Sequence, residues 1–174
     1  MKIEDIKYIS TKTGDLGTSS NYSNERFDKD DSLFEVLGTI DELSSNLGVV
    51  YHVINIQELK TIQQQLQTIN SIIATTKESQ KSRIKTISNE DIECLEELEN
   101  KYLLTASITH EFVLPGSESL ASAHLDVART VCRRAERRLI TFIKEHDRKD
   151  LQYVSMYLNR LSDLLFILAR QTKR

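Results

Sequence analysis

Apolar residues recur three and four positions apart in five separate segments of the chain, the spacing at which side chains share one face of an α-helix. The first segment begins at Ser32, which with Glu35 fits a capping box, and it reaches about Tyr51. The second covers 59–73, where Ile and Leu are interspersed with Gln and Thr. Each pattern predicts a helix that buries one face.

Three more helices are predicted in the second half of the chain, over 88–106, about 119–146 and about 150–170. Ser88 and Asp150 are the expected N-caps of the first and the last. The only proline of the chain lies between the first two and breaks the helical pattern. Five helices with short connections favour an all-α fold, an antiparallel five-helix bundle.

Two segments lack a helical period. Residues 1–31 are rich in Thr, Ser, Gly, Asp and Asn, and they are expected to form an irregular arm in front of the bundle, with the bundle itself over 32–172. Residues 77–86 have no apolar stripe and are expected to be a mobile connector. The whole chain, 1–174, is interpreted as a single domain.

Composition narrows the class of protein. Five Gly and one Pro in 174 residues are too few for a β-sandwich or barrel built on tight turns. A net charge of −3 argues against a general nucleic-acid binder, because affinity for a phosphate backbone needs an excess of Lys and Arg. No apolar run approaches the ~20 residues of a membrane span. The first residues do not form a signal peptide, so a cytoplasmic protein is expected.

The arm contains the first candidate for chemistry, the segment TKTGDLGTSS at 11–20. Its two glycines allow backbone amides to approach an anion, while Lys12 and several hydroxyls supply further donors, a combination that suits phosphate. The spacing is not that of a Walker A loop. A plain polar turn with glycines at positive φ is the alternative, and spacing alone favours it.

The second candidate is a run of basic residues on the helix predicted over 119–146. At 100° per residue, Arg129, Arg133, Glu136 and Arg137 lie within about a third of the helix circumference, opposite its apolar face. Such a cluster repels itself unless acidic side chains of other helices or a phosphorylated ligand compensate it. A solvated basic face is an equally good interpretation of the spacing.

Polar residues also interrupt two apolar helix faces. Asn159, Asp163 and Arg170 form one line on a Leu-rich helix, and Asp41 lies among apolar residues of the first helix. Such groups need hydrogen-bond or ionic partners when buried, and a structural salt bridge is the simpler role for Asp41. The four histidines and two cysteines have no metal-ligand spacing, so no metal-binding residues are predicted.

Six segments, taken together and in this order, resemble the PduO-type ATP:cob(I)alamin adenosyltransferases. They are TKTGDLGTSS at 11–20, KDD at 29–31, VLGTIDELSSNLG at 36–48, FVLPGS at 112–117, ARTVCRRAERR at 128–138 and YLNRLSDLLFILAR at 157–170. The resemblance implies a five-helix bundle that assembles as a homotrimer with active sites between subunits. It also implies an enzyme in which the Co(I) of a reduced corrinoid attacks the 5′-carbon of ATP and releases triphosphate.

The resemblance assigns ATP contacts to two subunits. From one subunit come Thr11, Lys12, Thr13, Gly14, Ser19, Ser20 and Lys29, and from the next come Arg133, Arg134, Glu136, Arg137 and Asn159. Mg²⁺ would bridge phosphate oxygens, as divalent ions do with few protein ligands. Contacts with a corrinoid reductase and with an enzyme that uses adenosylcobalamin are further expectations.

Four residues are expected to act in catalysis: Arg133, the pair of Asp41 and Arg129 across the subunit boundary, and Phe112. Phe112 matches the aromatic that crowds the lower face of the corrin, helps to expel the axial base and so makes Co(I) accessible. An aromatic directly before Leu-Pro-Gly can equally be a plug that anchors its loop to the core. The chain also departs from the family, because Asp126 stands where histidine is frequent.

Two other functions compete with this one. A catalytically inactive ATP-binding or scaffolding helical bundle would keep the nucleotide site without transfer activity. A nucleic-acid binder built on the arginine-rich helix is disfavoured by the acidic balance of charge and by the lack of aromatic residues among the arginines of 129–138.

Overall fold

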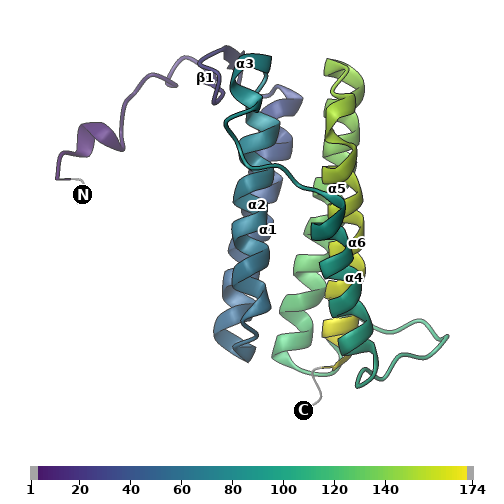
Figure 1. Cartoon of the computed structure of the whole chain (residues 1–174). Coiled ribbons are helices and arrows are strands. Elements are labelled where there is room, and N and C mark those ends of the chain that lie inside the picture. Colours follow the sequence, from purple (N-terminus) through teal and green to yellow (C-terminus); the bar gives the residue numbers. More distant parts are fainter. Residues whose placement is uncertain (1–3, 172–174) are drawn as a thin grey trace.

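The computed structural model describes residues 4–171, which form a helical bundle with an extended N-terminal arm (Figure 1). The long helices are α1 (Ser32–Ile54), α2 (Glu58–Ala74), α4 (Asn89–Leu103), α5 (Leu120–His146) and α6 (Gln152–Gln171). The five helices predicted from apolar spacing are therefore confirmed. None of the helices within the described range is long and apolar enough to cross a membrane.

Consecutive long helices alternate in direction, as expected of an antiparallel bundle (Figure 1). α1 packs against both α2 and α5, and α6 packs against both α5 and α4. α4 and α6 run parallel to each other, so their C-terminal ends meet at one end of the bundle, where the Ser107 amide donates to the carbonyl oxygen of Arg170 (3.3 Å). The opposite end holds the arm and the end of α5.

The core is mainly aliphatic and draws buried residues from all five long helices. Leu33, Ile40, Leu43 and Leu47 of α1, the first helix in the sequence, are completely buried, as the apolar spacing predicts. Burial of one such side chain contributes about 1.5–3 kcal/mol, which makes the shared core the main stabilisation of the helices.

Two predicted helix caps are wrong. α1 is capped by Asp31, whose carboxylate accepts from the Leu33 amide (2.8 Å), and not by Ser32. Asp150 does not cap α6. It lies in the short 3₁₀ helix η2 (Lys149–Leu151), and its carboxylate binds the guanidinium of Arg148 through two hydrogen bonds of 2.9 Å.

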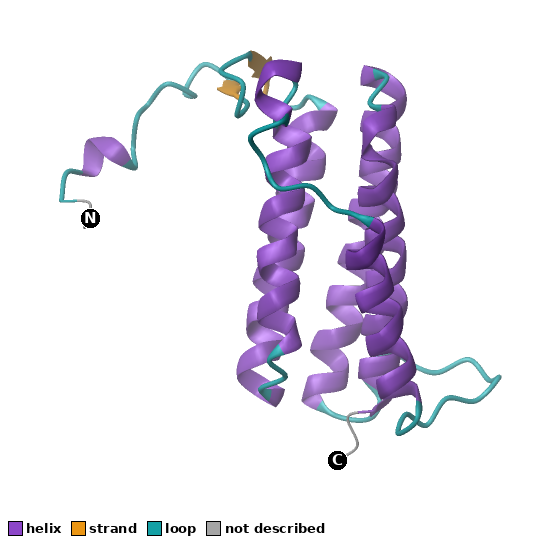
Figure 2. Cartoon of the chain, viewed as in Figure 1, coloured by secondary structure: helices purple, strands orange, loops and turns teal. Residues whose placement is uncertain are grey.

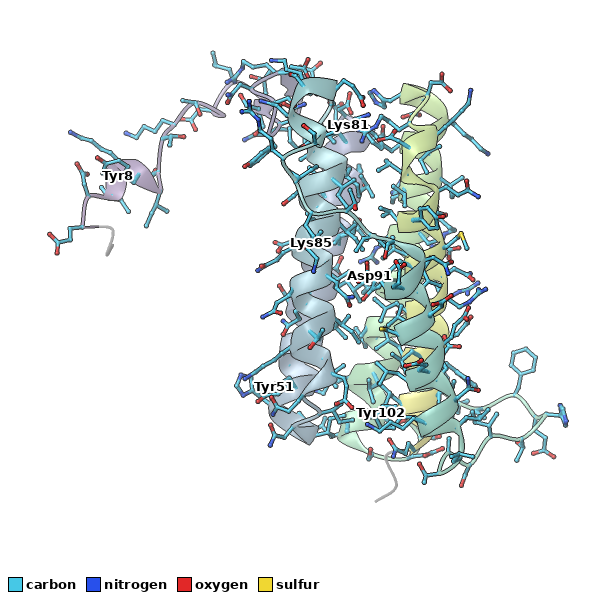
Figure 3. All side chains as sticks on the ribbon, in the orientation of Figure 1. Tyr8, Tyr51, Lys81, Lys85, Asp91 and Tyr102 are labelled. Carbon is cyan, nitrogen blue, oxygen red and sulfur yellow. The ribbon has the colours of Figure 1, made fainter. Side chains whose placement is uncertain are left out.

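The arm is more regular than its composition suggests. A 3₁₀ turn, η1 (Ile6–Tyr8), is followed by an antiparallel hairpin of β1 (Thr18–Ser20) and β2 (Arg26–Asp28), in which Ser19 pairs with Phe27. η1 lies far from the bundle, with Tyr8 pointing into open space (Figure 3).

The hairpin docks on the segment that follows α2. The Tyr22 amide donates to the carbonyl oxygen of Ala74 (3.1 Å), and the Ser23 hydroxyl donates to Gln80 (2.6 Å). Gln80 lies in the one-turn helix α3 (Glu78–Lys81), inside the segment expected to be only a mobile connector. That expectation is corrected, because this segment holds the arm at its end of the bundle (Figure 3).

Candidate functional site

The segment expected to bind phosphate is an exposed loop between η1 and β1. Lys12 adopts a left-handed backbone conformation (φ 57°), and Gly17 has φ 82°. The side-chain hydroxyls of Thr11 and Thr13 lie 3.0 Å apart, and the Gly17 amide donates to the carbonyl oxygen of Gly14 (3.2 Å). Two consecutive turns therefore present hydroxyls, amides and an ammonium on one short stretch of chain.

The hairpin brings Lys29 to this loop. The Lys29 amide donates to the carbonyl oxygen of Gly17 (2.8 Å), and the side chain of Lys29 lies against Gly14. Ser19 and Ser20 belong to β1, the strand that leaves the loop. The structure thus brings together all seven residues expected from the arm.

Arg26 of β2 ties the loop to the hairpin and was not singled out from the sequence. Its guanidinium donates to the carbonyl oxygen of Thr13 (2.8 Å) and to the hydroxyl of Thr18. Only the register of the hairpin, which a three-residue strand does not reveal in a sequence, places Arg26 beside the loop.

The basic face of α5 divides into two kinds of arginine. Arg134 forms an ion pair with Glu42 of α1, and Arg138 lies 3.5 Å from Glu35 of the same helix. Acidic side chains of another helix therefore compensate part of the cluster, one of the two possibilities that the sequence leaves open. Arg134, Arg138 and Thr141 also line a surface hollow of about 220 Å³ together with Arg137.

Arg133 and Arg137 have no such compensation. Both are exposed, and neither side chain forms an ion pair or a hydrogen bond with any part of residues 4–171. Between these two arginines on α5, the carboxylate of Glu136 accepts a hydrogen bond from the side-chain amide of Asn159 on α6 (3.2 Å). Two uncompensated guanidinium groups beside this polar pair form a surface that favours an anion.

Phe112 lies in the loop of residues 104–119 between α4 and α5, here called the Phe112 loop, which projects from the end of the bundle (Figure 2). The Phe112 side chain is fully exposed, so the interpretation as a plug anchored in the core is wrong. It lines an open hollow of about 510 Å³ together with Arg129 of α5 and Phe166 of α6.

Arg129 and Asp41 do not meet within one chain. The Arg129 Nε donates to the carboxylate of Asp126 (3.1 Å), one turn earlier on α5. Asp41 is exposed on α1, without an ion pair within residues 4–171. A contact between Asp41 and Arg129 therefore requires two chains.

The polar line on α6 is only partly buried. Asp163 is exposed, whereas Arg170 is buried and forms an ion pair with Asp126. The sequence does not predict this pair, because the two residues lie on different helices and 44 positions apart.

Cys132, inside the arginine-rich segment, is completely buried, and burial raises the pKa of its thiol. Residues 4–171 contain no group of three or more His, Cys, Asp or Glu that could hold a metal ion.

Comparisons with known proteins cover nearly the whole chain. The sequence pattern of the Cobalamin adenosyltransferase family matches residues 9–172. The chain is 40% identical to a corrinoid adenosyltransferase of Citrobacter freundii over 166 residues, 93% of each chain. It is also 40% identical to a corrinoid adenosyltransferase of Homo sapiens over 176 residues, 95% of this chain and 68% of the human one.

The fold is similar to a solved structure of a PduO-type ATP:corrinoid adenosyltransferase variant from Lactobacillus reuteri, complexed with cobalamin and ATP. The TM-score is 0.85 with 31% identity, over 94% of this chain and 92% of that one. A second variant of the same Lactobacillus reuteri enzyme, complexed with ATP, gives a TM-score of 0.83 with 32% identity, over 93% of this chain and 92% of that one.

Proposed function

The chain belongs to the cobalamin adenosyltransferase family, and we propose that it transfers the 5′-deoxyadenosyl group of ATP to the Co(I) of a reduced corrinoid. Co(I) supplies the electron pair of the new cobalt–carbon bond. The bond between C5′ and the α-phosphate oxygen breaks, and triphosphate leaves with the electrons of that bond. The products are adenosylcobalamin and triphosphate.

One observation carries the proposal for the ATP site: Arg133 and Arg137 are charged, exposed and without a counter-charge, while their neighbours are paired with α1. ATP brings the missing negative charge. Within residues 4–171, no hydrogen bond or ion pair joins the loop of 11–17 to these arginines. This supports a site whose two halves come from different subunits.

The arm supplies one half of the site. Lys12 and Lys29 provide charge, Gly14 allows the backbone to approach, and the hydroxyls of Thr11, Thr13, Ser19 and Ser20 provide donors. Ile6, Tyr8 and Ile9 of the arm are 68%, 77% and 70% exposed, which supports an arm that packs on a second copy of the chain. Head-to-tail contacts close into a ring when the rotation between copies permits it, and the ring proposed here is a homotrimer.

The face of α5 supplies the other half. Arg133, Arg134 and Arg137 bind triphosphate oxygens, and the pair of Glu136 and Asn159 completes the polar surface. Arginines that bind the charge developing on triphosphate lower the barrier to its departure. Mg²⁺ would add to this effect by neutralising part of the phosphate charge, and the hydroxyls of Thr11, Thr13, Ser19 and Ser20 would suit a metal–nucleotide ligand.

The corrinoid occupies the hollow beside Phe112. Arg129 lines that hollow, and Arg133 follows one helical turn later on α5, so the corrin and triphosphate sites are adjacent. Phe112 crowds the lower corrin face and displaces the axial base, which makes Co(I) accessible. Arg129 still has its terminal nitrogens for Asp41 of a neighbouring subunit, because Asp126 binds only its Nε.

The cytoplasm is the proposed compartment, which agrees with two free cysteines, Cys94 and Cys132. The proposed partners of the protein are a reductase that delivers Co(I) and an enzyme that accepts adenosylcobalamin. A reductant is needed because Co(I) is the nucleophile, and the alkylated corrinoid is a product that a further enzyme would use.

The first experiment is anaerobic incubation of the protein with ATP, Mg²⁺ and chemically reduced cobalamin. Conversion of the corrin absorption spectrum to that of adenosylcobalamin, with release of triphosphate, is the expected result. An ATP-binding or scaffolding protein without transfer activity would bind ATP and leave the spectrum unchanged.

The second experiment tests the division of the site between subunits. Lys12→Ala and Arg133→Ala chains, each defective alone, are unfolded together and refolded as mixed trimers. About one site in four then combines an intact arm from one variant with an intact α5 face from the other, so activity returns to roughly a quarter of wild type. Mixtures without recovered activity would place both halves in one subunit.

A further inference from the structure

The carboxylate of Asp126 lies at the base of the Phe112 loop, where it accepts three bonds. Oδ2 accepts from the Gly116 amide (3.0 Å) and from the guanidinium of Arg170, while Oδ1 accepts from Arg129 Nε (3.1 Å). Only 4% of the Asp126 surface is exposed. A carboxylate this deeply buried is costly unless it is fully hydrogen-bonded, so these bonds fix its position closely.

Arg170 holds the other end of the same loop. Its side chain binds Asp126, and its backbone carbonyl accepts from the Ser107 amide (3.3 Å). The guanidinium carbon lies 5.4 Å from the centroid of the Phe166 ring, which lines the hollow beside Phe112. Arg170 is 1% exposed, so this contact network is part of the interior.

We propose that Asp126 and Arg170 are positioning residues that clamp both ends of the Phe112 loop and thereby set the place of Phe112 in the corrin hollow. This inference rests on the proposed function, which puts the corrinoid beside Phe112. Ser107 and Gly116 are the two tied points, and Phe112 lies between them. Holding both ends shortens the free segment and lowers the entropy lost when Phe112 is placed against a corrin.

The clamp also orients Arg129. Asp126 binds Arg129 through Nε, so the terminal nitrogens of Arg129 remain available to an acceptor outside the chain. One carboxylate thus couples the loop that carries Phe112 to the arginine that lines the same hollow. Loss of Asp126 is therefore expected to disturb binding and reaction of the corrinoid more than binding of ATP.

Hydrogen exchange of the full-length protein tests the clamp without reference to activity. Asp126→Ala removes the acceptor of the Gly116 amide, and the double variant Asp126→Ala with Arg170→Met removes both buried charges in case the single variant does not fold. Amides of 105–118 are expected to exchange roughly tenfold faster in either variant. Asp150→Asn is the matched control, because it weakens a comparable pair with buried Arg148 at the opposite end of the bundle.

Kinetics test the consequence for the reaction. In the variants that lack Asp126, we expect the KM for the corrinoid to rise and kcat to fall at least about tenfold, with the KM for ATP within about twofold of wild type. The Co(II) corrinoid bound with ATP should show less of the four-coordinate signal by EPR. Asp150→Asn is expected to leave the corrinoid KM and this signal unchanged.

Three results would overturn the clamp: exchange of 105–118 no faster than in the Asp150→Asn control, equal loss of affinity for ATP and corrinoid, or an unchanged four-coordinate signal. If instead the proposed function is wrong, a different result is expected. Wild-type protein would then form no adenosylated corrinoid, whereas the exchange experiment would still show whether Asp126 and Arg170 hold the loop.

Discussion

Lys29 of the hairpin lies so close to Gly14, in the loop of 11–17, that a Cβ at residue 14 would be 3.0 Å from the ammonium nitrogen of Lys29. The same Cβ would be 3.2 Å from the carbonyl oxygen of Thr18. A side chain at this position would make unusually tight contacts, so the ammonium end of Lys29 would have to shift. The contact also explains how a lysine far along the hairpin reaches the loop.

Gly14→Ala is therefore expected to displace Lys29 and to raise the KM for ATP several-fold without lowering Tm, since the arm contributes little to the core. Steady-state kinetics and thermal melts measure both effects. Gly38→Ala is the matched control, because a Cβ at that exposed helical position meets nothing within 4 Å. The control should keep the KM for ATP and gain up to about 1 kcal/mol of stability. Equal kinetics in the two variants would contradict the role of Gly14.

Arg133→Ala is expected to raise the KM for ATP and to lower turnover. A charge-assisted contact with phosphate is worth about 1.5–3 kcal/mol, which corresponds to roughly a 10- to 150-fold loss in kcat/KM. Tm should stay the same or rise, because Arg133 has no counter-charge in the free protein and its removal relieves repulsion. Arg138→Ala, from the same face but paired with Glu35, is the control that keeps ATP kinetics. A normal KM for ATP in Arg133→Ala would refute the site.

Apolar spacing was sufficient to predict the five helices because each helix buries a single stripe in one shared core. Leu33 and Leu47, at the two ends of the stripe on α1, are both fully buried. The caps were harder, since Asp31 and Ser32 are adjacent and equally able to cap. Only the extended backbone of Asp31 decides between them. Asp150 stands where a cap is expected in the sequence, but its carboxylate binds Arg148 instead. Arg148 also donates to the carbonyl oxygens at the end of α2, a contact that the sequence does not reveal.

In the candidate site, too, the sequence predicts local features better than contacts between helices. The loop around Gly14 and the arginines of α5 were accessible to sequence reasoning, because their residues are neighbours in the chain. Which arginines lack a counter-charge was not, since that depends on the acids that α1 presents to α5. The pair of Asp126 and Arg170 depends likewise on how α5 and α6 are rotated against each other.

Asp41 and Arg129 are expected to be coupled across the subunit boundary. Because Asp126 still binds Arg129 Nε, loss of Asp41 should cost about 1.5–3 kcal/mol rather than the cost of a buried charge left without any partner. Asp41→Ala, Arg129→Ala and the double variant form a cycle, measured by trimer dissociation and by activity. Asp41→Ala should add little to Arg129→Ala, because the loss of Arg129 already removes the pair. Strict additivity would show that the two residues are not partners.

Glu99 of α4 predicts a dependence of stability on pH. Its buried Oε1 has no hydrogen-bond partner within residues 4–171. Burial raises the pKa of Glu99, and repulsion from Asp163 and Glu96 raises it further. Attraction to Arg160 opposes this only in part, and the resulting pKa is about 7. In the unfolded chain the pKa of a glutamate is about 4.3, so the folded state binds the proton more tightly. Stability therefore falls as pH rises from about 4.5 to about 7.

Glu99→Gln removes this penalty. The Tm of the variant should exceed that of wild type at pH 8, and the difference should shrink towards pH 5. Glu97→Gln, on the exposed side of the same helix, should shift Tm equally at both values of pH. A gain in Glu99→Gln that is the same at pH 5 and pH 8 would show that ionisation of Glu99 is not its cause.

Because Phe112 is exposed, an effect of its truncation on activity can be distinguished from an effect on stability, which the sequence alone does not allow. A buried aromatic plug would cost about 3–5 kcal/mol of stability on truncation to alanine. Phe112 buries nothing in the core, so Phe112→Ala should melt at the temperature of wild type. Any loss of activity in this variant then reflects chemistry in the hollow and not a smaller folded fraction.

Phe112→Ala is accordingly expected to lower turnover strongly while Tm and the affinity for ATP hold. Without the ring, the axial base stays bound to cobalt, Co(II) is harder to reduce and the four-coordinate EPR signal weakens. Leu114→Ala, also exposed in the Phe112 loop, is the control for loss of an apolar side chain there, and it should leave signal and turnover intact. If Phe112→Ala kept the full four-coordinate signal with ATP bound, crowding of the lower corrin face by this ring would be excluded, whatever happened to turnover.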